Sequence, residues 1–459
     1  MFKILPKHLF IGIVVFFPLC GLTAWHVHAA IPAAERAALI ALYSGTDGDN
    51  WNDNSGWKTP PLDVDGFALP GTENTWFGVT TDGGNASVTA INLGNNQLTG
   101  SIPLELGNLS NLQALRLNRN QLSGDIPAEL GNLANLQAVI LEFNQLTGTI
   151  PIQLGNLTNL INLDLQWNQL TGNIPTELGN LIDLEGLDLR WNQLTGNIPI
   201  EIGNLANLEG LSLNHNQLTG DIPAELGNLS NLRVLWLHNN QLTGNIPAEL
   251  GNLTNLQMLE LHNNRLSGTI PGEIGNLINL ATLVINANML RGAIPLSLIN
   301  LSGLSNTDIG YNALYTDNAT LDTSLNNKDP DWKDTQTVAP ENVTASTTSD
   351  TSVEVSWTLI IYTADSGGYQ VFYSTSSGGP YTAFGTTIDK SAYQTEVTGL
   401  NPGTTYFFVV KTLTEPHIQN QNTIESENSQ ETTATTTGDS GDGGGCFIAT
   451  AAYGFRKAK

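Results

Sequence analysis

Apolar and polar positions alternate along this chain within a 24-residue unit that occurs ten times. A column of asparagines marks the period: Asn96, Asn120, Asn144, Asn168, Asn192, Asn216, Asn240, Asn264, Asn288 and Asn312. In each unit two leucines such as Leu115 and Leu117 are two residues apart, which predicts a short strand with one buried face. A single unit cannot bury that face, but stacked units bury it continuously. The pattern therefore predicts a curved solenoid with a long parallel sheet on its concave side.

Two asparagine columns are expected to hold the stacked units together. A buried amide is costly unless it is hydrogen-bonded. We therefore expect each asparagine of the 24-residue column to bond the backbone of its own and the neighbouring unit. A second column, Asn108 to Asn276 in the Gly-Asn-Leu triplet, is expected to tie the convex side together in the same way.

The full unit is more specific than its periodicity. Around Asn120 it consists of Leu112, Leu115, Leu117, Asn120, Leu122, Gly124, Ile126, Pro127, Leu130, Gly131, Asn132 and Leu133. At these positions residues 88–315 resemble leucine-rich repeats of the plant-specific class, which also occur in bacterial secreted proteins. The resemblance implies an α/β solenoid with a parallel concave sheet. It also implies a protein that binds proteins, peptides or glycans and is not an enzyme.

Residues 30–87 resemble the N-terminal cap of such a solenoid. An amphipathic helix is predicted over Glu35 to Tyr43, and Trp51, Trp57 and Trp76 follow it. Plant caps usually carry a cysteine pair in this region, whereas Thr81 stands where one cysteine is expected. Packing of the three tryptophans must therefore replace the disulfide.

A second periodicity begins after an expected linker at 316–337. Residues 338–435 alternate in short strands separated by Gly, Ser and Pro, predicted at 342–345, 352–357, 369–373, 394–397 and 405–412, which is typical of an all-β sandwich. The segments ending at Trp357 and Tyr406 resemble the second and sixth strands of a fibronectin type III domain. The resemblance implies that Trp357 lies in the core and Tyr406 is the corner tyrosine.

Both ends of the chain carry features of export. Residues 1–29 have two early lysines, an apolar stretch and a small-residue cleavage site, which indicates a secretory signal, with an uncleaved membrane anchor as the alternative. A Gly- and Asp-rich linker, 436–445, precedes residues 446–459, which resemble the CFI-box at the C-terminus of many bacterial exported proteins. Cys446 is therefore a candidate for attachment or processing, or a plain free thiol.

Composition narrows the environment and the partners. The only cysteines are Cys20, inside the expected signal, and Cys446, so the folded part contains no internal disulfide. An exported protein without disulfides suits a bacterial envelope or surface. The net charge of −25 repels nucleic acid and anionic membranes. We expect a secreted or cell-surface protein whose membrane association, if any, runs through its C-terminus.

Because packing fixes the leucines, ligand specificity must reside in the variable strand positions. The candidate ligand-binding residues on the concave face are Phe143, Asp164, Trp167, Asp188, Arg190, Trp191, His215, Trp236, His238 and Glu260. A row of exposed aromatics bordered by carboxylates is able to stack on sugars or to anchor peptide side chains. The alternative is that repeat duplication copied a tolerated tryptophan. Adjacent His238 and His262 are able to bind zinc, but solvated polar residues explain them equally, and we predict no metal and no cofactor.

These features together predict an extracellular recognition or adhesion protein that binds a protein, peptide or glycan on the concave face. Two alternatives remain at this point. One is a structural component of the cell envelope, and the other is an enzyme acting on polysaccharide. The sequence carries no nucleophile elbow, phosphate loop or zinc-protease motif to support the second alternative.

Overall fold

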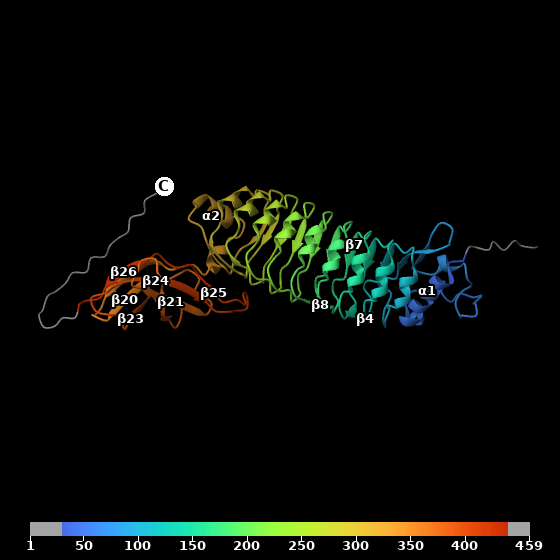
Figure 1. Ribbon diagram of the computed structural model, residues 1–459, viewed down its shortest axis with the longest axis horizontal. Helices are drawn as coiled ribbons and strands as arrows, with labels where there is room; N and C mark the ends of the chain where they lie inside the picture. Colours follow the sequence, from blue (N-terminus) through green and yellow to red (C-terminus); the bar gives the residue numbers. More distant parts are fainter. Residues whose placement is uncertain (1–29, 439–459) are drawn as a thin grey trace, which may run out of the picture.

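The computed structural model describes residues 30–438, so the expected signal and the Cys446 tail lie outside the described residues. Figure 1 shows an elongated, twisted solenoid of repeats with a smaller β-sandwich at its C-terminal end. Among residues 30–438, no helix has the length and apolarity needed to cross a membrane.

The predicted long sheet has eleven strands. In spatial order they are β1 (Val79–Thr81), β2 (Val88–Asn92), β3 (Ala114–Arg116), β5 (Ala138–Ile140), β7 (Asn162–Asp164), β9 (Gly186–Asp188), β11 (Gly210–Ser212), β12 (Val234–Trp236), β13 (Met258–Glu260), β15 (Thr282–Val284) and β17 (Asn306–Asp308). β1 runs antiparallel to β2. Every later pair is parallel, and each residue pairs with its equivalent in the next repeat, as in Ser212, Trp236 and Glu260. Equivalent side chains of successive repeats therefore lie side by side, and the outward-pointing ones form what we call the long-sheet face.

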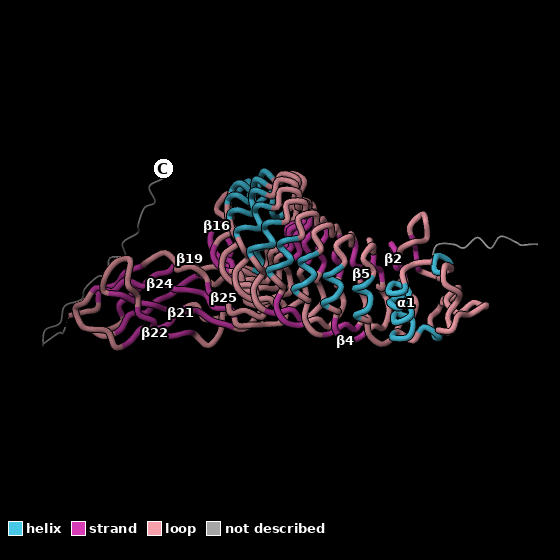
Figure 2. The backbone as a smooth tube through the Cα atoms, turned by 45° about the vertical axis from the view of Figure 1, so that its right-hand side comes forward, coloured by secondary structure: helices cyan, strands magenta, loops and turns pink. Residues whose placement is uncertain are grey.

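The other flank of each repeat is a short 3₁₀ helix, so the repeats themselves contain no α-helix. These helices are η3 (Leu104–Asn108), η4 (Ala128–Asn132), η5 (Ile152–Asn156), η6 (Thr176–Asn180), η7 (Ile200–Asn204), η8 (Ala224–Asn228), η9 (Ala248–Asn252), η10 (Gly272–Asn276) and η11 (Leu296–Asn300). Each follows a proline whose fixed φ starts the turn. Figure 2 shows them stacked along one flank.

Short strands between the long sheet and the 3₁₀ helices pair across neighbouring repeats and form small sheets. Their strands are β4 (Ser123–Asp125) with β6 (Gln145–Thr147), β8 (Thr171–Asn173) with β10 (Gln193–Thr195), and β14 (Ser267–Gly268) with β16 (Met289–Ala293) and β18 (Ala313–Tyr315).

The first asparagine column forms the predicted ladder. Asn144 donates from Nδ2 to the carbonyl of Leu117 in the preceding repeat at 3.0 Å and to that of Leu141 in its own repeat at 3.1 Å. Its Oδ1 accepts from the backbone N–H of Leu122 at 3.0 Å. The same contacts recur from Asn120 to Asn312, which confirms the prediction.

The second asparagine column was assigned to the wrong asparagine of each repeat. Side chains at Asn108 and Asn132 are exposed. The contacts between repeats come from the asparagine that follows shortly after, as in Asn135, which donates to the Ser110 carbonyl at 2.9 Å, and Asn159, which donates to the Ala134 carbonyl at 2.8 Å. The reason is geometric, because the earlier asparagine ends the 3₁₀ helix with its side chain toward solvent.

The N-terminal cap is built on helix α1 (Ala33–Gly45), with η1 (Gly48–Asn50) and η2 (Glu73–Thr75). Trp51, Trp57 and Trp76 are buried and pack in sequence, with ring centroids 5.2 and 4.7 Å apart, as predicted. The sequence analysis missed a buried ion pair beside them, in which Arg36 Nη1 donates to Glu73 Oε1 at 2.6 Å.

At the other end, the stretch expected to be a linker closes the solenoid. It contains α2 (Ala319–Asn326) and η12 (Trp332–Thr335). Gln336 stands one repeat length after Asn312 and continues its ladder, since Oε1 accepts from the Leu314 N–H and Nε2 donates to the Ile309 carbonyl, both at 2.9 Å.

The second domain is the predicted antiparallel sandwich. Its strands are β19 (Glu341–Thr347), β20 (Ser352–Thr358), β21 (Gly367–Ser374), β22 (Thr382–Thr386), β23 (Gln394–Thr398), β24 (Thr405–Thr414), β25 (Ile424–Glu425) and β26 (Thr432–Thr435). Trp357 is buried in the core, and the Tyr406 hydroxyl accepts from the Asn401 N–H at 2.9 Å, as a corner tyrosine does. Strand β22 escaped prediction because all five of its residues are exposed, so they show no alternation.

A loop of the sandwich is bonded to the end of the solenoid. Asn420, which is buried, donates from Nδ2 to the carbonyls of Asn288 and Tyr311 at 2.9 and 2.8 Å. Asn422 donates to the Asn264 carbonyl at 2.6 Å. Three successive repeats therefore hold the sandwich in one orientation.

Replacing Asn420 and Asn422 together with alanine is expected to release the sandwich. Each lost bond contributes about 1 kcal/mol and leaves a buried carbonyl without its partner. Small-angle scattering should then show a broader distribution of interdomain distances. Ile418→Ala, an exposed change in the same loop, is the control, and a distribution identical to wild type in the double variant would contradict the bonded arrangement.

Candidate functional site on the long-sheet face

The 24-residue register brings four of the candidate residues into one stack. Ring centroids are 5.4 Å apart from Phe143 to Trp167, 4.3 Å from Trp167 to Trp191 and 3.6 Å from Trp191 to His215. The planes of successive rings differ by only 11 to 13°. We call these four residues the aromatic ladder.

The backbone of the aromatic ladder is unusual for such large residues. All four have φ between 52 and 55°, in the left-handed region that L-residues other than Asn and Gly seldom adopt. Asn95, Asn239 and Asn263 hold the same place in other repeats with nearly the same φ. The stack thus replaces residues that suit this backbone better, and packing between the rings offsets the strain.

The stacking changes how the aromatic ladder meets a ligand. Because the rings cover each other, their broad faces are not available to a sugar ring within the row. Phe143, Trp167 and Trp191 remain 36, 41 and 39% exposed, and the overlap of neighbouring rings leaves their edges as the part that a ligand is able to reach. At the start of the row the Arg119 guanidinium lies 4.7 Å from the Phe143 centroid, and at its end Asn239 Nδ2 lies 3.2 Å from His215 Nε2. This geometry offers a sugar ring less flat apolar surface than a row of separate rings would.

An acidic pair borders the aromatic ladder. Asp164 and Asp188 are register partners on β7 and β9, so their like charges are adjacent. Burial raises the pKa of Asp164 to about 6 and that of Asp188 to about 7. The nearby Arg190 opposes the shift of Asp188, with its Nε 3.2 Å from Asp188 Oδ2.

A hydrogen-bonded network extends from this pair to Glu142 on one side and to Trp236 on the other. Gln166 donates to Glu142 Oε2 at 3.0 Å and accepts from Arg190 Nε at 2.8 Å. The Arg190 guanidinium lies 5.3 Å from the Trp236 centroid, a cation–π contact. The structure therefore connects Asp164, Asp188, Arg190 and Trp236 as one group.

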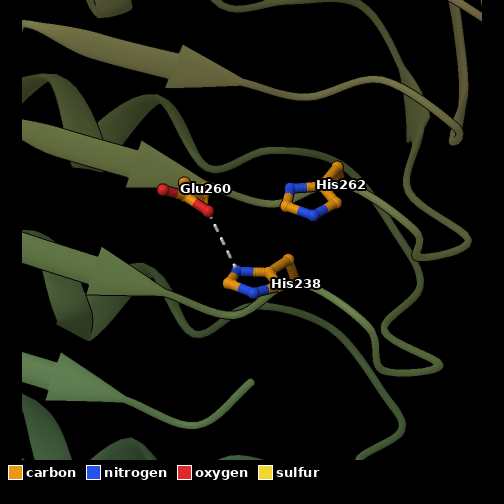
Figure 3. Close-up of side chains that lie close together, drawn as sticks. All are labelled: His238, Glu260 and His262. Atoms are coloured by element: carbon orange, nitrogen blue, oxygen red, sulfur yellow. Dashed lines mark ion pairs between the residues drawn. The ribbon is translucent and has the colours of Figure 1, made fainter. Parts of the chain in front are cut away.

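A third group lies on the next repeats. His238 Nδ1 is 3.4 Å from Glu260 Oε2, and the rings of His238 and His262 stack at 4.3 Å (Figure 3). Burial lowers the pKa of His238 to about 3 and that of His262 to about 4, so both imidazoles are neutral at pH 7. Burial also raises the pKa of Glu260.

Two residues that the sequence analysis left unassigned complete this group. Asn214 and Asn286 stand in the same 24-residue column as His238 and His262, and Asn214 Nδ2 is 3.0 Å from His238 Nε2. The signal was the register itself, which places His238 and His262 in one column and extends by one repeat on either side to Asn214 and Asn286. The acidic pair thus shares its two repeats with Trp167 and Trp191 of the aromatic ladder, and the histidine group lies on the repeats that follow His215.

Comparisons with known proteins agree with this architecture. A family model described as a leucine-rich repeat region matches residues 189–328, and a leucine-rich repeat model matches 87–109, 111–133 and 159–181. A fibronectin type III domain model matches residues 338–431. The search of curated proteins returned no match.

Solved structures give further views of the solenoid. The ectodomain of the plant membrane receptor kinase GASSHO1/SCHENGEN3 from Arabidopsis thaliana, in complex with CASPARIAN STRIP INTEGRITY FACTOR 2, is 41% identical over 61% of this chain and 33% of its own, with a TM-score of 0.57. The Arabidopsis HAESA ectodomain, in complex with a peptide hormone, is 32% identical over 62% and 47%, with a TM-score of 0.52. A plant ice-binding protein is 29% identical over 62% of this chain and 88% of its own, also with a TM-score of 0.52.

The chain spans a third to a half of the length of these two receptor ectodomains. What is shared is the repeat solenoid, while the sandwich is matched by its own family model. Leucine-rich repeats and fibronectin type III domains are typically non-catalytic binding domains. The chain is a leucine-rich-repeat protein whose plant-type repeat region is followed by a fibronectin type III domain.

Proposed function

We propose that this protein is an extracellular or cell-surface recognition protein that binds a peptide or protein segment along the long-sheet face. The observation that carries the proposal is the aromatic ladder, whose exposed ring edges run beside the acidic pair. Aromatic side chains at such a density on a surface are typical of anchor sites in interfaces. The strip runs from Phe143 to Glu260, across the third to eighth repeats.

The geometry favours a peptide over a glycan. Ring edges in a row form a narrow apolar surface that also carries indole N–H donors. Such a surface suits the side chains of an extended peptide segment, whereas sugars stack on free ring faces. The carboxylates of Asp164 and Asp188 are adjacent and partly buried, so their negative charges repel each other. A lysine, arginine or terminal amine of the ligand would relieve that repulsion, so we expect the ligand to carry a cation.

The comparisons support this ligand class. Two of the similar ectodomains were solved in complex with CASPARIAN STRIP INTEGRITY FACTOR 2 and with a peptide hormone. We carry over only the class of ligand, because this chain covers less than half of either receptor ectodomain.

The cellular setting is proposed from the two ends of the sequence. The secretory signal at residues 1–29 and the CFI-box resemblance at 446–459 suggest a bacterial exported protein, with Cys446 as the point of attachment or processing. Mass spectrometry of the mature protein from native cells tests both ends. A mature chain that retains residue 1 and carries an unmodified Cys446 would contradict this setting.

The binding test pairs an aromatic-ladder variant with a matched control. Trp167→Asn with Trp191→Asn installs the residue that three other repeats carry at this left-handed position, so the fold should persist. Affinity for peptides selected on the wild-type protein is expected to fall at least about 100-fold. Ile200→Ala changes an exposed residue on η7 to one that η8 and η9 carry at the same place, and should bind like wild type.

The same experiment separates the alternatives. Equal affinity of the Trp167→Asn, Trp191→Asn variant and wild type would exclude the aromatic ladder as the site. Concentration-dependent ordered assembly without any ligand would favour a structural envelope component. Turnover of a polysaccharide that is lost in Asp164→Asn and Asp188→Asn would favour an enzyme.

A further inference from the structure

We propose that His238, Glu260 and His262 form a binding site for a divalent transition metal of the zinc type. The site lies on the long-sheet face, where β12 and β13 end. The inference goes beyond the sequence analysis, which predicted no metal. It is independent of the proposed peptide ligand.

The distances are close to those of a zinc site. His238 Nδ1 and Glu260 Oε2 are 3.4 Å apart, which is about the separation of neighbouring ligand atoms around a tetrahedral Zn²⁺ with bonds of about 2.1 Å. The three ligand atoms all lie within 4.8 Å of one another. A contraction of at most about 1.4 Å along the remaining edges is therefore enough to close the site.

The imidazole rings need a small rotation for this. In the structure they stack with their planes 10° apart, so the lone pairs of their nitrogens lie in nearly parallel planes. Figure 3 shows one nitrogen of each ring on the side of Glu260. Tilting the His262 ring about its side-chain bonds makes the two lone pairs converge, and the backbone of the sheet does not have to move.

Unsatisfied polar atoms concentrate at this place. Within the described residues, eight buried side-chain nitrogen or oxygen atoms have no hydrogen-bond partner in the protein. Five of the eight belong to the site and its immediate columns: Asn214 Oδ1, Trp236 Nε1, His238 Nδ1, His262 Nδ1 and Asn286 Oδ1. A buried polar atom without a partner is unfavourable, and a metal bound to the two Nδ1 atoms would satisfy both. His238 is only 9% exposed, so its Nδ1 is not a surface donor.

Asn214 supplies the second contact that a metal-bound histidine requires. Ligating histidines hold the proton on the other ring nitrogen by donating it to an oxygen. His238 Nε2 is 3.0 Å from the Asn214 side-chain amide, and that amide has an unpartnered oxygen, Oδ1. Rotation of the amide brings this oxygen to Nε2–H and leaves Nδ1 free for the metal.

The surrounding charge and access suit a cation. The side chain of Glu260 is 22% exposed and that of His238 11% exposed, so an ion is able to enter from the long-sheet face. The nearby Arg190 is held by Asp188 at 3.2 Å, which offsets its repulsion. Two imidazoles and one carboxylate favour Zn²⁺ or Cu²⁺ over Ca²⁺ and Mg²⁺, which prefer oxygen ligands.

The test is calorimetric titration of Zn²⁺ into untagged protein that carries Cys446→Ser, which removes the one thiol outside the signal. We expect one ion per chain, and Co²⁺ in the same site should show the visible spectrum of a four-coordinate complex. Ca²⁺ should not compete. Wild-type protein that takes up no Zn²⁺, or a Co²⁺ spectrum of the free aqueous ion, would overturn the proposal.

The variants are drawn from residues that other repeats already carry. His238→Asn and His262→Asn each install the residue found at Asn214 and Asn286, and each should weaken Zn²⁺ binding more than about 100-fold, as should Glu260→Gln. Asn214→Ser should weaken it about 10-fold to 100-fold. Glu209→Gln, which changes an exposed carboxylate of another repeat and leaves the three ligands intact, should keep wild-type affinity. Unchanged affinity in Glu260→Gln with a wild-type circular dichroism spectrum would show that bound metal lies elsewhere.

Discussion

Glu73→Leu is expected to lower the free energy of unfolding of the N-terminal cap by about 3 kcal/mol. Glu73 is 1% exposed and pairs with Arg36 at 2.6 Å. Its other oxygen accepts from the Gly71 N–H at 2.8 Å. Removing this carboxylate leaves the Arg36 charge buried, with only Asp65 and the Ala68 carbonyl as partners. Urea unfolding followed by tryptophan fluorescence measures the loss, because three tryptophans lie in the cap.

An exposed ion pair in the same cap provides the control. Lys58 contacts Asp49 at 2.7 Å, but both side chains are solvated, so Lys58→Gln should leave the unfolding midpoint near that of wild type. Arg36→Leu combined with Glu73→Leu should recover part of the loss, since it removes the uncompensated charge. Equal stability of Glu73→Leu and wild type would mean that the buried pair contributes nothing.

The second large effect is on pH dependence, through Asp188. Its pKa rises from 3.8 in an unfolded chain to about 7 in the folded protein. Between pH 4 and pH 7 the folded state therefore binds a proton that the unfolded state has released, and stability falls as the pH rises through this window. The penalty is complete about one pH unit above the folded-state pKa and is on the order of 4 kcal/mol.

Asp188→Asn should remove this component, because asparagine does not titrate. The difference in unfolding free energy between variant and wild type is then near zero at pH 4 and grows in favour of the variant up to pH 8. Taking the difference cancels the contributions of His238 and His262, which titrate in both proteins, whereas Asp164 loses the repulsion of its neighbour and adds to the same trend. Asp183→Asn, an exposed aspartate of the same repeat, is the control. A difference that is flat across the pH range would contradict the raised pKa of Asp188.

The fold was predictable at positions where one residue type makes the same contact in every repeat. The ladder of Asn120 and its equivalents follows from the cost of burying an amide, and the leucine face follows from a period of two. The convex asparagines were misassigned because Asn132 recurs in every repeat and Asn135 in most of them, and only the turn of the 3₁₀ helix decides which one faces the next repeat. Gln336 was missed because it continues the ladder with a different residue type.

The candidate site was predictable in position but not in conformation. The register places Phe143, Trp167, Trp191 and His215 in one row, and the structure shows that row. Whether the rings stand apart or lie against each other depends on side-chain torsions in a left-handed backbone, which no sequence pattern encodes. The raised pKa values of Asp164 and Asp188 likewise depend on how deeply the neighbouring side chains cover them.

Because the 24-residue register is unbroken, equivalent side chains on the long-sheet face recur at a constant spacing. Each repeat advances the strip by one strand spacing of about 4.8 Å, so a ligand is measured in whole repeats. Deleting one whole repeat, from residue 168 to residue 191, would shorten the aromatic ladder by one ring while leaving the histidine group and every remaining ladder asparagine in register. Gain or loss of whole repeats is thus able to retune ligand length without redesigning the core.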